Sequence, residues 1–218
     1  MENKNITPPD NQNYEYSLQQ AYRIACDNLL AFEDIEEQCR KSGSQFRKSG
    51  DTSSIEIPYL GKPVRVTLPE ITVTYENEDE VIPLREKVLI LHYFISAKGT
   101  PPSGRYKTYG ELPEGAVYLR TFTKRTIMPV VDRFGKEPEK LLEAGKVFGG
   151  TPADIGDVSV TIPAFSAVPV TYVLWAGDDE FSPEGNLLFD ANVTDYLPTE
   201  DITIIGEILA WKLVRSAR

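Results

Sequence analysis

A cluster of carboxylates and aromatic side chains follows an apolar, strand-like run late in the chain. Its members are Trp175, Asp178, Asp179, Glu180 and Phe181. Three adjacent carboxylates repel one another, so an opposing charge or donor must stabilise them. A helix N-terminus, an arginine or a hard cation would do so, although the spacing does not match an EF-hand loop. Three hypotheses stay open: a structural turn paired with arginine, a ligand or substrate site, and a metal site.

A second candidate is the irregular stretch 98–110, which contains Arg105, Tyr106, Lys107 and Tyr109. A loop of thirteen residues without regular structure inside a compact domain more often has a function than serves only as a connection. Guanidinium and ammonium groups beside flat, partly polar rings suit an anionic ligand that is extended or ring-shaped. The alternative is a surface loop with ordinary solvated charges.

The chain has one histidine and two cysteines, which limits metal and nucleophile chemistry. Multi-histidine zinc or iron sites cannot be built from His92 alone, and we predict no metal ligand. His92 lies in the most apolar helical run of the sequence, which favours a structural histidine over a catalytic base. We interpret Cys26 and Cys39 as reduced, buried or half-buried thiols.

The formal net charge is −10, which speaks against nucleic acid and anionic membranes as partners. Its distribution is uneven, because residues 98–146 carry 10 bases and 6 acids, whereas 147–211 carry 11 acids and no Lys or Arg. One explanation is that the two regions pack side by side and neutralise each other's charge. The other is that residues 98–146 form an anion-attracting surface next to an acidic surface. The polar N-terminus and the lack of a membrane-length apolar run predict a cytoplasmic protein.

The hydrophobic pattern predicts a flexible N-terminal arm at 1–14 and a single compact α+β domain at 15–218. Ser17 and Gln20 form a capping-box pattern at the start of the first helix. The expected helices cover 17–32, 34–43 and 83–97, with two or three more in 112–148 and a last one from 199. The expected strands cover 55–75, as an antiparallel meander, 158–162 and 168–175. Strands in two groups with helices packed around them favour antiparallel pairing over βαβ alternation.

Several strings of the sequence resemble a bacterial and archaeal family called domain of unknown function 3786. These strings are Pro58–Gly61, Leu91–Tyr93, Tyr109–Pro113, Gly149–Gly150, Val173–Phe181, Leu188–Asp190 and Tyr196–Asp201. The resemblance spans roughly residues 15–213. It implies a protein of anaerobes, and an association with corrinoid, tetrapyrrole or one-carbon metabolism. The iron–sulfur module of some members requires four cysteines, which this chain lacks. The resemblance supplies no catalytic residue.

We therefore expect a ligand-binding accessory protein whose pocket lies between the basic segment 98–125 and the acidic segment 175–201. Arg105 and Arg120 would donate hydrogen bonds at the rim, and acids such as Glu200 could converge on the acidic turn. The walls would be aromatic: Tyr106, Tyr109, Tyr118, Phe122, Trp175 and Phe181. A corrinoid or another anionic ring-like molecule is the expected ligand, held without histidine coordination. The alternatives are a carboxylate-based enzyme, with or without Mg²⁺ or Ca²⁺, and a structural or partner-binding domain.

Overall fold

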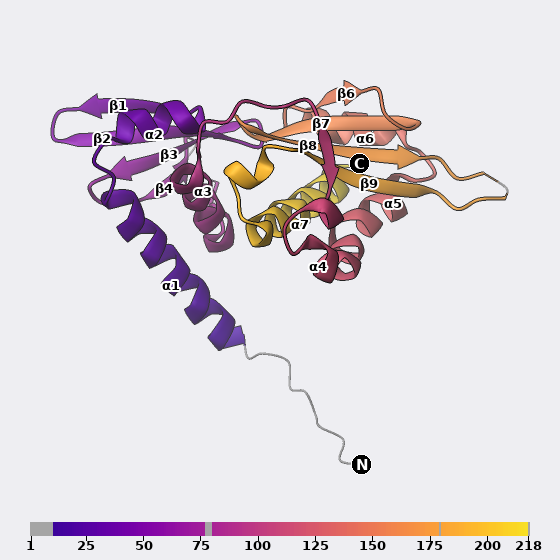
Figure 1. Ribbon diagram of the computed structural model, residues 1–218, viewed down its shortest axis with the longest axis horizontal. Helices are drawn as coiled ribbons and strands as arrows, with labels where there is room; N and C mark the ends of the chain where they lie inside the picture. The colour runs from indigo at the N-terminus through magenta and orange to yellow at the C-terminus, as the bar shows by residue number, and fades with distance from the viewer. Residues whose placement is uncertain (1–10, 77–79, 179, 218) are drawn as a thin grey trace, which may run out of the picture.

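The protein is built on a nine-stranded antiparallel sheet that helices cover (Figure 1). The computed structural model describes residues 11–76, 80–178 and 180–217. The main path of the sheet runs β4-β3-β2-β7-β8-β9-β5, while β1 pairs with β2 and β6 pairs with β7. The predicted α+β class with an antiparallel sheet is confirmed.

The elements follow one another along the chain as two groups of strands separated by helices. The helices are α1 (Asn11–Leu30), α2 (Ile35–Ser42), α3 (Leu84–Ser96), α4 (Gly115–Phe122), α5 (Met128–Phe134), α6 (Glu139–Lys146) and α7 (Thr199–Ser216). The first group of strands is β1 (Gln45–Ser49), β2 (Thr52–Tyr59), β3 (Lys62–Leu68) and β4 (Val73–Tyr75). The second group is β5 (Tyr106–Thr108), β6 (Thr151–Ala153), β7 (Val158–Phe165), β8 (Val168–Trp175) and β9 (Glu184–Asp190).

The predicted meander is present as β2, β3 and β4. Apolar residues of β2 and β3 that alternate with polar ones are fully buried, among them Ile55, Ile57 and Val64. A period of two places such residues on one face of a strand, and that face meets the core. The pattern missed β1, whose five residues are mostly exposed and polar. A solvated strand carries no hydrophobic signal.

The first half of the sheet joins the second through one pair, Tyr59 of β2 opposite Phe165 of β7. Their rings pack 5.1 Å apart, and the Phe165 ring also stacks on Tyr93 of α3 at 4.0 Å. Three buried aromatic side chains therefore hold the two strand groups in one continuous sheet.

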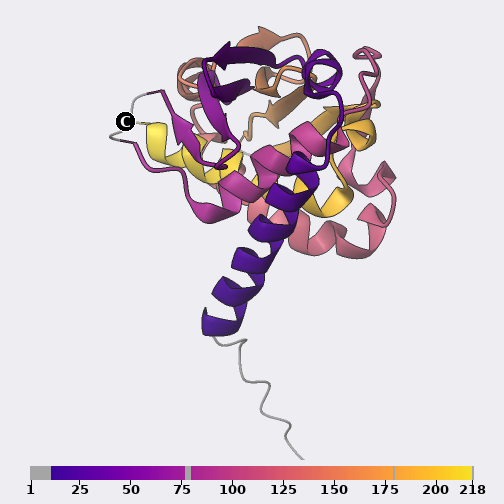
Figure 2. The ribbon, with the colours of Figure 1, turned by 90° about the vertical axis from the view of Figure 1, so that its left-hand side faces the viewer.

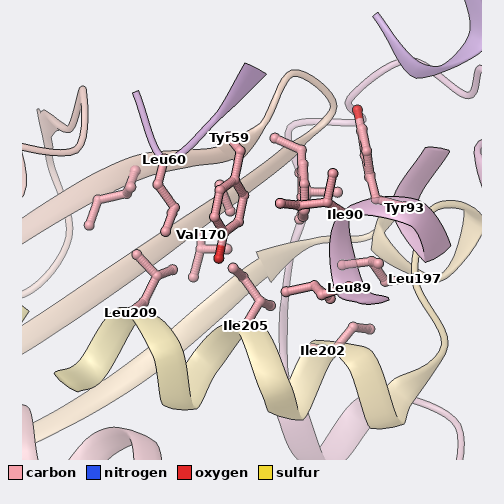
Figure 3. Packing of buried hydrophobic residues seen from close by; sticks show 14 of the residues in the cluster. Tyr59, Leu60, Leu89, Ile90, Tyr93, Val170, Leu197, Ile202, Ile205 and Leu209 are labelled. Carbon is pink, nitrogen blue, oxygen red and sulfur yellow. The ribbon is translucent and has the colours of Figure 1, made fainter. Parts of the chain in front are cut away.

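Helix α7 lies under the middle of the sheet and supplies much of the core. In Figure 3, Ile202, Ile205 and Leu209 rise from α7 toward Tyr59 of β2 and Val170 of β8. All three α7 side chains are fully buried. Their spacing of three and four residues keeps one stripe of the helix against the sheet and leaves the neighbouring stripe for other contacts.

Helix α2 begins and ends where its sequence predicts. The carboxylate of Asp34 accepts a hydrogen bond from the Glu37 backbone N–H at 2.8 Å, which caps the first turn. Gly43 closes the helix in the left-handed conformation with φ 64°.

Helix α1 begins at Asn11 and projects from the body of the molecule (Figure 2). The capping box predicted at Ser17 is wrong, because the Ser17 hydroxyl lies within the helix and donates to the Asn13 carbonyl at 2.8 Å. Ala25 and Leu29 are buried in the core, whereas Tyr14 and Tyr16 near the free end are more than half exposed. The predicted arm thus contributes residues 11–14 to a helix, and residues 1–10 lie outside the described part.

Within the described residues, no helix has both the length and the apolar character needed to span a membrane.

Candidate functional site

A cleft of about 550 Å³ opens between the start of α4, the turn that follows α4, and one side of α7. Helix α4 contributes Val117 and Tyr118, and α7 contributes Thr199, Glu200, Thr203, Ile204 and Glu207. The remaining walls are Arg85, Tyr109, Glu114 and Arg125. A cleft of this size, with aliphatic and aromatic walls and a few polar groups, has the general form of a small-molecule site.

A π-helical turn, Thr123–Ile127, links α4 to α5 and shapes one end of the cleft. Its hydrogen bond runs from the Met128 N–H to the Thr123 carbonyl, five residues back. Pro129 explains the widening, because a proline ring in a regular α-helix clashes with the carbonyl four residues earlier, that of Arg125. Single π-helical turns within helices are frequent at functional sites, and this one presents Arg125 to the cleft.

Two arginines converge on one buried carboxylate, Glu207 of α7. An Nη2 donor of Arg85 lies 2.6 Å from Glu207 Oε2, and Nη1 of Arg125 lies 3.2 Å from Oε1. The Glu207 side chain is 11% exposed and that of Arg125 is 56% exposed. A buried carboxylate needs such partners, because an unpaired buried charge is strongly unfavourable. Two guanidinium groups on one carboxylate leave a net charge of about +1 at this end.

The floor of the cleft is a hydrogen-bonded pair of side chains. Thr203 donates its hydroxyl hydrogen to the Thr199 carbonyl, so the Tyr109 hydroxyl, 2.8 Å away, donates to the Thr203 oxygen. The Tyr109 ring stacks on Phe122 of α4 with centroids 3.8 Å apart. The Tyr109 oxygen therefore keeps an acceptor position, and the ring that carries it is fixed in place.

The cleft walls are held close together by Tyr172 and Gly206. The Tyr172 hydroxyl reaches from β8 toward the carbonyls of Thr126 and Gly206 at 3.4 and 3.2 Å. A Cβ atom on Gly206 would lie 3.1 Å from Thr126 Cγ2, so the absence of a side chain lets α7 approach the π-helical turn. The burial of Tyr172 raises the pKa of its hydroxyl far above the usual range.

A second polar pair, His92 and Asp201, connects α3 and α7. His92 Nδ1 lies 2.8 Å from Asp201 Oδ2, and the Asp201 side chain is 6% exposed. The hydrogen bond to Asp201 raises the pKa of His92 and outweighs its partial burial, which lowers it. The structure thus places His92 in a specific hydrogen bond, in agreement with a structural histidine.

Of the residues singled out in the sequence, Tyr109, Tyr118 and Glu200 line this cleft. Arg105 and Tyr106 lie at the sheet edge, where β5 pairs with β9, and both are exposed. Arg120 is exposed on α4. Trp175 ends β8 opposite Glu184 and is 40% exposed. The predicted aromatic and cationic set is therefore not brought together at one place.

The stretch 98–110 is anchored by carboxylates of the acidic segment. Asp190 accepts hydrogen bonds from the Ser103 backbone and hydroxyl and from the Gly104 backbone, at 2.8–3.0 Å. Burial raises the pKa of Asp190, but these donors and the Asn192 N–H outweigh it and lower the pKa overall. The stretch is thereby tied to the end of β9. The prediction that all of it lacks regular structure is wrong, because Tyr106–Thr108 form β5 and a 3₁₀ turn begins at Tyr109.

The acidic turn lies at the far end of the β8–β9 hairpin, which extends to one end of the molecule (Figure 1). Asp178 Oδ1 accepts from the backbone N–H groups of Glu180 and Phe181 at 2.8 and 2.7 Å. These bonds lower the pKa of Asp178. The turn borders a smaller hollow of about 290 Å³ with Gly135 and Lys136. Asp179 lies outside the described residues.

We predict that Ca²⁺ will not raise the melting temperature of the protein beyond the effect of ionic strength. Asp178 is held by backbone donors within the turn, which stabilise its charged form without a cation. Thermal melts with CaCl₂ and with NaCl at equal ionic strength test this. A shift that is specific to Ca²⁺ and lost in Asp178→Asn would show that the turn binds the ion.

Sequence reasoning missed Arg85, Glu114, Arg125 and Glu207. Glu207 carried the clearest signal, because a carboxylate among the apolar residues of a core helix requires a cationic partner. Pro129 inside a helical run signalled an irregular turn next to Arg125. Neither signal shows which residue of another helix or turn is the partner, because that pairing is set by the tertiary fold.

Both cysteines are free thiols in the structure. Burial raises the pKa of Cys39 to about 11 and also raises the pKa of Cys26. Among the residues that the structure describes, no three His, Cys, Asp or Glu side chains form a group suited to a metal ion.

The fold and the cleft define an α+β domain with an antiparallel sheet and a helix-walled candidate binding site. The chain belongs to the family described as Domain of unknown function (DUF3786), whose model matches residues 34–212. This confirms the family predicted from the sequence strings. All residues that line the cleft fall within the matched span, and α1 precedes it. No curated protein and no solved structure matches the chain.

Proposed function

We propose that the protein is an accessory protein that binds a small molecule in the cleft between α4 and α7. The observation that carries the proposal is the pairing of Arg85 and Arg125 on Glu207 at the end of a 550 Å³ apolar-walled space. Ligand sites commonly have this size and this combination of apolar walls with a few placed polar groups.

The arginine donors remaining at this end support a polar contact with the ligand. Arg125 uses Nη1 for both Tyr118 and Glu207. Within the described part of the chain, its Nε and Nη2 hydrogens have no acceptor. A guanidinium group already fixed by two bonds loses little conformational freedom when it binds a further acceptor. The site is therefore pre-organised for a ligand with an acceptor at this end.

A cleft-blocking variant tests the proposal. Val117 lines the cleft and is 93% exposed, so Val117→Trp should fill the opening while the fold stays intact. Ala116→Trp places the same ring on the adjacent exposed position of α4, outside the lining, and serves as the control. Metabolites would first be screened against the wild type by calorimetry, and native mass spectrometry of anaerobically purified protein would detect a co-purifying ligand.

We expect any metabolite that binds the wild type to lose at least about tenfold in affinity with Val117→Trp, or about 1.4 kcal/mol, and to bind Ala116→Trp normally. A ligand that binds all three proteins equally does not occupy this cleft. That result would contradict the proposed site.

The corrinoid implied by the family resemblance stays a prediction. A corrin ring with its side groups is larger than the cleft, so it could insert an edge between Val117 and Ile204 and leave the rest outside. Cobinamide and cobalamin belong in the same screen, with absorbance as the readout. Binding no tighter than about millimolar, roughly −4 kcal/mol, would exclude a dedicated corrinoid site.

The two alternative functions have weaker support. An acid–base enzyme is expected to have carboxyl groups with raised pKa in its cleft. The opposite shift, a lowered pKa, is found at five carboxyl groups: Glu111, Glu137, Asp178, Asp190 and Asp195. A partner-binding role would draw on the projecting half of α1, where Tyr14 and Tyr16 are exposed.

A further inference from the structure

The cleft carries opposite charges at its two ends. Glu200 lies in the first turn of α7, and Glu207 with its two arginines lies seven residues further along the same helix. A rise of 1.5 Å per residue separates these positions by about 10 Å along the helix axis. A ligand that lies along the cleft is therefore close to negative charge at the Glu200 end and to positive charge at the arginine end.

Glu114 and Glu200 form the acidic end. The Thr199 hydroxyl donates to the Pro113 carbonyl at 2.8 Å, which ties the start of α7 to the residue before Glu114. Both carboxylates are exposed and line the cleft, and neither takes part in an ion pair with another described residue.

The helix poles at this end do not cancel the two carboxylates. The N-termini of α4 and α7 both lie there, and each contributes a partial positive charge of about +0.5 at most. Two carboxylates contribute −2, so a net charge of about −1 remains. A cationic group of a ligand is therefore favoured here.

The opposite end favours an anion. Arg85 and Arg125 outnumber Glu207, and the Nε and Nη2 groups of Arg125 have no acceptor among the described residues. A carboxylate or phosphate accepts such donors in paired geometry. Between the ends lie Val117, Tyr118 and Ile204, whose apolar surfaces suit an uncharged body.

We propose that the ligand of this cleft is a zwitterion, with a cationic group at Glu114 and Glu200, an anionic group at Arg125, and an apolar body between them. This inference rests on the proposed function, since it specifies the chemical class of molecule that the same cleft binds. It excludes a simple fatty acid, which lacks the cationic group, and a simple amine, which lacks the anionic one.

Three straight-chain probes of equal length test the inference: 8-aminooctanoate, octanoate and octylamine. When extended, the first has its two charged ends about as far apart as the two ends of the cleft. Calorimetry on the full chain at low salt should show 8-aminooctanoate binding at least about tenfold more tightly than either singly charged probe.

The double variant Glu114→Gln/Glu200→Gln should bind 8-aminooctanoate no more tightly than octanoate. The control Glu139→Gln/Glu143→Gln removes the same charge from exposed positions on α6 and should keep the preference. Equal affinities for 8-aminooctanoate and octanoate in the wild type, tightest binding of octylamine, or no binding of any probe would each overturn the zwitterion inference. The proposed function would survive those results if another metabolite bound the wild type and lost affinity with Val117→Trp.

Discussion

Gly115→Ala should destabilise the protein by about 3 kcal/mol or more, because its Cβ would lie 2.0 Å from the Tyr109 carbonyl oxygen. A backbone oxygen cannot move aside as the end of a flexible side chain can. The start of α4 would have to shift away from Tyr109, which would separate two walls of the cleft. For a chain of this length we expect the melting temperature to fall by roughly 6–12 °C.

Gly110→Ala is the matched control for this change. The new Cβ would lie 3.3 Å from Leu119 Cδ2, the end of a side chain that can rotate. We expect a loss below about 1 kcal/mol, measured by urea unfolding of both variants with the same slope. Equal stability of the two variants would contradict the close approach of α4 to Tyr109.

The fold was predictable where the sequence shows a clear alternation of polar and apolar residues or clear helix-capping residues. The residues of β2 and β3 alternate in polarity with period two, and Asp34 and Gly43 delimit α2 by side-chain and backbone chemistry. These signals act over a few residues and need no partner. The Ser17 pattern failed because α1 already begins at Asn11, and within a helix a serine hydroxyl bonds to the preceding turn.

The sequence placed a pocket between segments 98–125 and 175–201, and the cleft has lining residues from both. Its arginine–carboxylate end was not predictable, because Arg85 and Glu207 lie outside those segments. The sequence drew attention to residues whose types are unusual side by side, such as Asp178 and Glu180. The structure satisfies Asp178 within its own turn. By contrast, Arg85 and Glu207 are 122 residues apart, and each is ordinary in its own helix. Their relation depends on the packing of α3 against α7, which no local pattern records.

The uneven charge along the sequence has a structural counterpart. Lys98 pairs with Asp195 at 2.9 Å, and Arg125 pairs with Glu207 at 3.2 Å, so the basic segment does contact the acidic one. Both hypotheses drawn from the charge pattern keep some support. Exposed pairs such as Lys98 with Asp195 contribute little to stability, whereas the Arg125 pair is part of the candidate site.

His92→Ala should destabilise the protein by about 2 kcal/mol at pH 6, because it leaves the Asp201 carboxylate buried without its partner. Removing one partner of a fully buried ion pair costs more stability, about 3–5 kcal/mol. The smaller value applies because the His92 side chain is 35% exposed. The first turn of α7 also keeps some positive potential around Asp201.

The same pair should make the stability of the protein depend on pH. The folded-state pKa of His92 is raised above its unfolded value by the hydrogen bond to Asp201. The proton-linked stabilisation is therefore fully present below about pH 6.5 and is lost as the pH rises through the folded pKa. His92→Gln can still donate to Asp201 but does not titrate, so the wild type should lose stability relative to this variant between pH 6 and 8. Urea unfolding across that range measures the difference, and parallel curves for the two proteins would show that His92 is not protonated against Asp201.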